Sequence, residues 1–307
     1  MTFPAAGPPE PDPAFGATGV PRPLAPAPGA PGEERGRRAH ARSRKPAKAP
    51  RSSRVEHLAV VPDVDGPRVR LGMAWAFVVF TAAAAGPVWI GVWMAAVGGI
   101  AAVQCSRSWR SRSRRPHDIV TVAGAAALPL AAGVSALATG IMLALFGAAA
   151  VGAVFLRAAA GRATRGRLSA SLTFTMGASI GLAAAAPVLA RQLGVVEAIV
   201  LLAFVGVFDA SNYLIGSGAS NPWEGPAAGM AFIAAVTLAV AAVFVPPFRG
   251  ASPWLLGLLA LVLTPAGPVL ASSLLGTADA KVPALRRLDS LLLTGPIWVA
   301  VATFTVS

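Results

Sequence analysis

From Leu71 to the C-terminus, the sequence consists of apolar stretches of membrane-spanning length separated by short polar breaks. A helix needs about 20 mainly apolar residues to cross the hydrocarbon core of a bilayer. Dividing the sequence at its polar breaks predicts nine such helices, at residues 71–86, 88–105, 118–138, 140–156, 169–190, 195–215, 226–246, 253–275 and 289–306. The composition agrees, because only 13% of the residues are charged, against about 25% in soluble domains. We therefore predict an all-α, polytopic integral membrane protein.

The distribution of basic residues gives the predicted helices an orientation. Of the 26 Lys and Arg residues, 24 fall on one side of the nine-helix arrangement and only Arg191 and Arg249 fall on the other. Cytoplasmic loops carry the excess of basic residues in membrane proteins. We therefore expect a cytoplasmic N-terminus, an external C-terminus and a location in a bacterial plasma membrane. Several segments are short or rich in glycine, so seven or eight spans is the alternative.

Residues 1–70 differ in composition from the predicted transmembrane domain, which covers residues 71–307. The first part of this segment is rich in Pro, Ala and Gly, and the second part, EERGRRAHARSRKPAKAPRSSR, is strongly basic with almost nothing to bury. This composition predicts a disordered cytoplasmic tail. Anionic lipid headgroups of the adjacent leaflet are the expected partner. A protein partner is an alternative, and no nucleic acid is expected because aromatic residues do not alternate with the basic ones.

Acidic residues in the transmembrane domain are concentrated at the predicted cytoplasmic face. Four of the six lie there: Asp209, Glu224, Asp279 and Asp289. Three basic residues are close to them in sequence: Lys281, Arg286 and Arg287. Carboxylates at one membrane face, beside basic groups, are typical of a Mg²⁺ site next to phosphate ligands. The alternative is structural, because Glu224 and Asp289 lie where an acid stabilises a helix start, and neighbouring polar groups could satisfy Asp209.

Other motifs favour packing over chemistry. The pairs Gly177/Gly181 and Gly225/Gly229 have the spacing of glycines that allow two helices to approach closely. Neither a phosphate-binding loop nor a dinucleotide-binding glycine fingerprint occurs in the sequence. The three histidines lie in the tail or in a basic loop, which argues against a histidine-based zinc or nucleophilic site within the membrane.

Two segments resemble the CDP-diacylglycerol synthases, also called phosphatidate cytidylyltransferases. In the first, Asp209 is followed by Asn212-Tyr213, Gly216 and the stretch SNPWEGPAAG, whose Trp-Glu-Gly core is its most specific part. The second is LASSLLGTADAKVPALRRLDSLLLTGPIW, in which Arg287, Asp289-Ser290 and a proline in the final helix match that family's C-terminal signature. The resemblance covers residues 195–300 by motif and the membrane domain by its number of helices.

This resemblance implies transfer of CMP from CTP to phosphatidic acid, giving CDP-diacylglycerol and pyrophosphate with Mg²⁺ as cofactor. The implied catalytic residues are Asp209, Asp279 and Asp289, and Asp279 and Asp289 are the implied metal ligands. The implied substrate-binding residues are Asn212, Tyr213, Ser220, Trp223, Glu224, Lys281, Arg286, Arg287 and Ser290. A homodimer is one assembly compatible with these features.

The sequence also departs from the family pattern. Arg286 stands where the family has an aspartate, a His-Gly-Gly element is missing, and Gly276-Thr277 replaces a basic pair. Replacing a metal-binding carboxylate by arginine should weaken Mg²⁺ binding unless Asp279 takes its place. A non-catalytic relative, with a lipid-binding, nucleotide-binding or scaffolding role, is therefore an alternative. A small transporter is a third, since Asp209 and Pro226 resemble the polar midpoint of a transporter.

Overall fold

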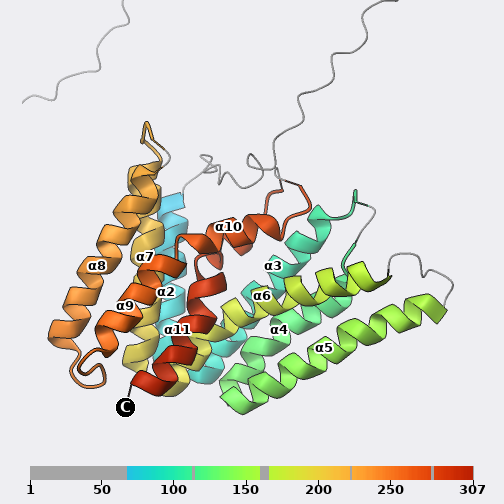
Figure 1. Ribbon diagram of the computed structural model, residues 1–307, viewed down its shortest axis with the longest axis horizontal. Helices are drawn as coiled ribbons and strands as arrows, with labels where there is room; N and C mark the ends of the chain where they lie inside the picture. Colours follow the sequence, from blue (N-terminus) through green and yellow to red (C-terminus); the bar gives the residue numbers. More distant parts are fainter. Residues whose placement is uncertain (1–67, 113–114, 160–165, 222, 278–279, 307) are drawn as a thin grey trace, which may run out of the picture. The chain divides into compact units, whose positions relative to one another are not determined.

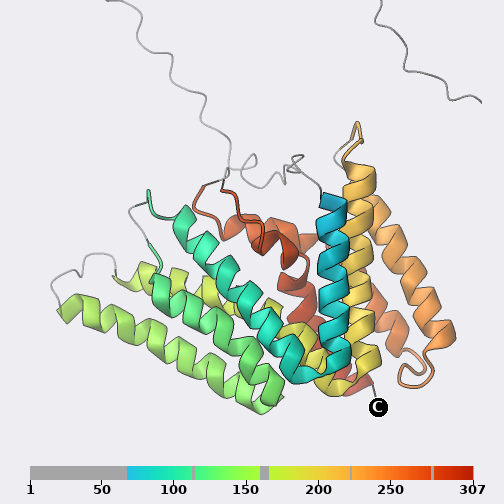
Figure 2. The ribbon, with the colours of Figure 1, turned by 180° about the vertical axis from the view of Figure 1, so that it is seen from behind.

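The computed structural model describes residues 68–112, 115–159, 166–221, 223–277 and 280–306. Every regular element in these ranges is helical, which confirms the all-α prediction (Figures 1 and 2). The elements are α2 (Arg68–Ala85), α3 (Pro87–Ser108), α4 (Asp118–Val134), α5 (Ala136–Ala159), α6 (Gly166–Leu193), α7 (Val195–Gly216), α8 (Glu224–Val243), α9 (Ser252–Leu263), α10 (Ala266–Ser273), the 3₁₀ turn η3 (Leu285–Arg287) and α11 (Leu291–Thr305). The predicted tail lies outside the described residues, except for its last three.

Each predicted apolar segment coincides with one helix, or with two in the case of 253–275. Within the described ranges, six helical segments are long and apolar enough to cross a membrane: α3, α5, α6, α7, α8 and the segment Leu285–Thr305 that contains α11. The pair α9 and α10 makes seven if it is counted as one bent span, whereas α2 and α4 are apolar but shorter. The membrane character is confirmed, and nine spans stays a prediction.

The eighth predicted segment is broken in the middle. Helices α9 and α10 differ in direction by 43°, and Thr264 and Pro265 lie at the break. Proline lacks a backbone N–H and its ring clashes with the preceding turn, so it is a common cause of such a bend. The Oγ1 atom of Thr264 forms a buried hydrogen bond of 3.1 Å with Oγ1 of Thr294 in α11. The bend therefore directs α10 across the start of α11.

Helix α6 is at the centre of the packing. It contacts α2, α3, α4, α5, α7 and α11, and Figures 1 and 2 show it between the two margins of the helical bundle. The stretch Ala183–Ala186 is fully buried. Small side chains on this helix let its neighbours approach closely, as van der Waals packing within a membrane requires.

Helices α5 and α8 lie at opposite margins of the bundle (Figure 1). Only 17% of the apolar window of α5 and 22% of that of α8 are buried against the rest of the protein. Large apolar side chains cover the exposed surfaces, for example Leu137 and Phe155 on α5, and Phe232 and Leu238 on α8. Soluble proteins rarely expose apolar areas of this extent, so contact with lipid is the natural explanation for both surfaces.

The glycines of α6 fill the packing role that their spacing predicts. A Cβ atom on Gly177 would overlap the ring of Phe146, which α5 inserts between Gly177 and Gly124. We expect Gly177→Val to destabilise the protein by roughly 1–3 kcal/mol through overpacking, measured as a lower thermal unfolding midpoint in detergent. Gly206→Val in α7 is the matched control, because a Cβ there meets no atom within 4 Å. Equal midpoints for the two variants would contradict this packing.

Candidate functional site

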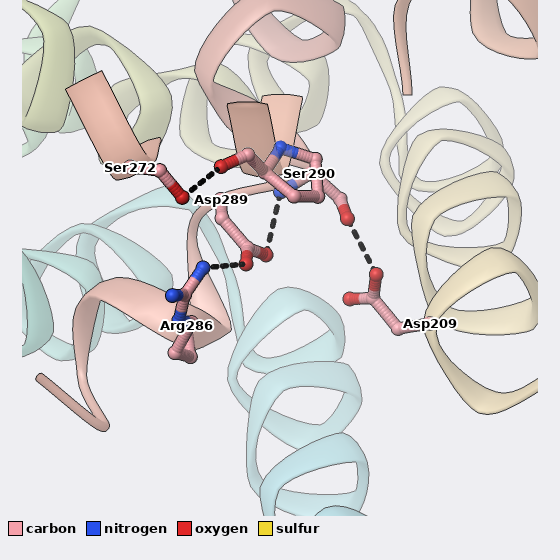
Figure 3. Close-up of polar contacts among 6 residues, drawn as sticks. Asp209, Ser272, Arg286, Asp289 and Ser290 are labelled. Carbon is pink, nitrogen blue, oxygen red and sulfur yellow. Dashed lines mark hydrogen bonds and ion pairs between the residues drawn. The ribbon is translucent and has the colours of Figure 1, made fainter. Parts of the chain in front are cut away.

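Two acidic residues from distant parts of the sequence meet through one serine. Asp209 lies near the C-terminal end of α7, and Asp289 and Ser290 immediately precede α11. The Ser290 hydroxyl donates a hydrogen bond to Oδ1 of Asp209. The Ser290 backbone N–H donates to Oδ1 of Asp289 over 2.8 Å. Figure 3 shows the two carboxyl groups on either side of Ser290. We call Asp209, Asp289 and Ser290 the acidic cluster.

Burial makes the acidic cluster electrostatically demanding. Asp289 and Ser290 are buried, with 7% and 1% of their surfaces exposed, and Asp209 is half-buried. Carboxylates removed from water are stable only when a cation or hydrogen-bond donors compensate the charge. Ser290 supplies donors to both acids, but two neighbouring carboxylates still repel each other. The cluster therefore requires positive charge close by.

Two arginines supply that charge. Arg286 in η3 places Nη1 3.6 Å from Oδ2 of Asp289, and Figure 3 shows its guanidinium beside that carboxylate. This separation makes an ion pair but is too long for a hydrogen bond, and the buried Nη1 atom has no hydrogen-bond partner among the described residues. The charge of Arg287 acts on Asp209 from the same turn. With both arginines, the cluster is formally neutral.

Helix α10 holds the acidic cluster from above in the view of Figure 1. A Cβ atom on Gly267 would overlap the carbonyl oxygen of Asp289 and lie 2.9 Å from Cα of Ser290. Glycine at this position therefore allows α10 to touch the backbone of the cluster. The hydroxyl of Ser272, also in Figure 3, donates to the Pro268 carbonyl of its own helix over 2.9 Å. Sequence reasoning did not identify Gly267, because nothing in its local pattern marks this contact.

The Trp-Glu-Gly core lies at the turn between α7 and α8. Gly225 is buried against Asn212 and Gly216, where a Cβ atom would lie 3.0 Å from Cα of Gly216. Glu224 is exposed and accepts a hydrogen bond of 3.3 Å from the Ser220 hydroxyl. The glycine thus fixes the close crossing of the two helices, while the acid caps an exposed turn.

Several predicted site residues are not joined to the acidic cluster. Trp223 is 74% exposed, Lys281 is exposed, and Tyr213 is half-buried. In the part of the chain that the structure describes, no hydrogen bond or ion pair connects the cluster to these three residues, nor to Asn212, Ser220 or Glu224. Asp279 lies outside the described residues. The structure therefore brings together Asp209, Arg286, Arg287, Asp289 and Ser290.

A long-range connection that the sequence did not reveal fastens the segment before η3 to the end of α3. The indole Nε1 of Trp109 donates to the Leu274 carbonyl over 2.9 Å, and Nε of Arg112 donates to the Gly276 carbonyl over 2.9 Å. The Gly276 N–H donates to Oγ of Ser108 over 2.9 Å. Because more than 160 residues separate these partners, no local pattern could predict the contact.

The donor set of the acidic cluster suits a hard divalent cation. Among the described residues, no group of three or more His, Cys, Asp and Glu side chains could hold a metal ion. Mg²⁺, however, commonly binds through one or two carboxylates and takes its other ligands from phosphates and water. Asp209 and Asp289 provide two carboxylates and Ser290 a hydroxyl in one place. These residues fit Mg²⁺ if Arg286 moves away from Asp289.

Comparison with family models, with curated proteins and with solved structures found no match to this chain. The resemblance described above therefore depends on the residues quoted for it and on their geometry.

Proposed function

We propose that this chain is a phosphatidate cytidylyltransferase-like membrane protein, which transfers CMP from CTP to phosphatidic acid. One observation carries the proposal. The hydrogen bonds of Ser290 bring Asp209 and Asp289 together, and these two acids come from the two separate segments in which the resemblance lies. Independent packing of the two segments would have no reason to join those residues.

In this proposal the chain crosses a bacterial plasma membrane nine times with its N-terminus in the cytoplasm. The distribution of basic residues supports this orientation. The end of α3, the turn between α7 and α8, and the α10–η3 connection all lie at the same end of the bundle in Figures 1 and 2. That end would be cytoplasmic, where CTP is available. The basic tail would bind anionic headgroups of the same leaflet.

The side chains of the cluster would position two anionic substrates for one displacement. Asp209 and Asp289 would hold Mg²⁺, which when bound neutralises charge on the triphosphate of CTP. Arg286 and Arg287 would pair with phosphate oxygens, and Lys281 would add a third cation from the exposed loop. An oxygen of the phosphatidate phosphate then bonds to the α-phosphorus of CTP as the bond to pyrophosphate breaks. Ser290 would fix the orientation of both carboxylates.

A non-catalytic relative of the same fold is the second candidate, and the ion pair between Arg286 and Asp289 favours it. A guanidinium beside a metal-binding carboxylate competes with the metal for the same oxygens. A neutral cluster could also hold a lipid phosphate or a nucleotide without reaction. The two candidates differ in turnover.

The test is formation of CDP-diacylglycerol by the purified full-length protein in detergent, with phosphatidate, radiolabelled CTP and Mg²⁺. We expect labelled lipid and an equal amount of pyrophosphate, and no product after chelation of Mg²⁺. Absence of product from protein with a cooperative thermal unfolding transition would overturn the enzymatic proposal and leave the non-catalytic candidate.

A further inference from the structure

A second polar site lies between α3 and α4, and none of its lining residues belongs to the acidic cluster. It is a cavity of about 410 Å³ at the end of the bundle where α3 ends and α4 begins. Its lining includes Ser106, Arg110, Arg115, His117 and Asp118. We call it the α3–α4 pocket.

The α3–α4 pocket presents several hydrogen-bond donors. Arg110 and Arg115 contribute two guanidinium groups, and the side chain of Arg110 has no hydrogen-bond partner among the described residues. His117 accepts a hydrogen bond from the Val120 N–H at Nδ1, so in its neutral form the ring carries its proton on Nε2 and remains a donor. The first backbone N–H groups of α4 also lie here, and a helix N-terminus favours an anion.

Ser106 points independently to a missing ligand. Only 3% of its surface is exposed, yet it lines the pocket. Its hydroxyl finds only the sulfur of Met176, at 3.9 Å. A thioether is a weak acceptor, and buried hydroxyl groups normally have a full hydrogen-bond partner. An oxygen-rich ligand in the pocket would satisfy this group.

Charge and position define what that ligand is. Two arginines outweigh the one carboxylate of Asp118, so the pocket favours an anion. Ile119, with 76% of its surface exposed, gives the pocket an apolar rim at the end of a helix in a membrane protein. The cavity is also larger than inorganic phosphate would fill. We propose that the α3–α4 pocket binds the phosphate of an anionic phospholipid headgroup, with the acyl chains passing along Ile119.

The test uses the full-length protein in a neutral detergent and short-chain phosphatidylglycerol, which has no phosphomonoester to act as a substrate. Binding is measured as the rise of the thermal unfolding midpoint during titration. We expect Arg110→Gln combined with Arg115→Gln to weaken binding at least about tenfold, because two charge-assisted hydrogen bonds are lost. Arg70→Gln combined with Arg107→Gln removes the same charge outside the pocket and should change affinity less than about twofold.

Three further arms separate the outcomes. Short-chain phosphatidylcholine should bind at least about tenfold more weakly than phosphatidylglycerol, because its headgroup carries no net charge. Inorganic phosphate that binds as tightly as phosphatidylglycerol would overturn the assignment to a lipid. Equal losses in the two double variants would overturn the pocket itself and indicate attraction by the whole basic surface. Asp289→Asn should leave this binding unchanged, so the result does not depend on the proposed transfer reaction.

Discussion

Replacing Asp289 with asparagine is expected to lower CTP-dependent formation of CDP-diacylglycerol by at least about 100-fold. The change removes one of two carboxylates from the acidic cluster and leaves Arg286 without its ion-pair partner. Reduced metal binding and an unpaired guanidinium both oppose the proposed transfer. The measurement is the initial rate at saturating CTP and Mg²⁺, with the thermal unfolding midpoint of each preparation determined alongside it.

Glu197→Gln provides the matched control for this variant. Glu197 is a buried acid in the first turn of α7, at the opposite end of the helix that carries Asp209. It loses the same charge without touching the acidic cluster, so its rate should stay within about threefold of the native rate. An Asp289→Asn protein that retains the native rate would show that the cluster is not the site of transfer.

Arg286→Asp is expected to create Mg²⁺-dependent stability that the native protein lacks. The substitution would place a third carboxylate beside Asp209 and Asp289, and the three negative charges would repel each other without a cation. Bound Mg²⁺ would relieve that repulsion, and a ligand present at 100 times its Kd stabilises a protein by about 2.7 kcal/mol. The measurement is the thermal unfolding midpoint with and without Mg²⁺, which requires no enzymatic activity.

The control is Arg249→Asp, on the exposed connection between α8 and α9. The change in net charge is identical, but no part of the acidic cluster is near that connection in sequence or by any described contact. Its unfolding midpoint should respond to Mg²⁺ as the native midpoint does. The same response in both variants would show that Mg²⁺ acts on the protein surface in general, and the argument that Arg286 excludes a metal would be wrong.

The helices could be predicted from sequence because length and hydrophobicity act locally. The bend between α9 and α10 could not, since membrane helices tolerate proline when neighbouring groups compensate the backbone. Whether Pro265 interrupts a helix or only kinks it depends on contacts such as that between Thr264 and Thr294. The number of spans stays open for the same reason, because α2 and α4 fall short of full length.

The acidic cluster was predictable in part. Topology placed Asp209 and Asp289 at one membrane face, and the structure brings them into one network through Ser290. Topology also placed Glu224 there, but its side chain bonds to Ser220 on an exposed turn. A sequence gives the face on which a residue lies and not the direction of its side chain. The role of Gly267 depends on the path of α10, which follows from the unpredicted bend.

The bonds from Ser108, Trp109 and Arg112 to the segment before η3 mean that the motifs do not form a separable module. A fragment that begins at Val195 would contain both segments of the resemblance but would leave the Leu274 carbonyl and the Gly276 amide without these partners. Backbone groups without partners are costly away from water. Any chimera that borrows the C-terminal motifs would therefore also need the end of α3, and evolution would have had to change the two regions together.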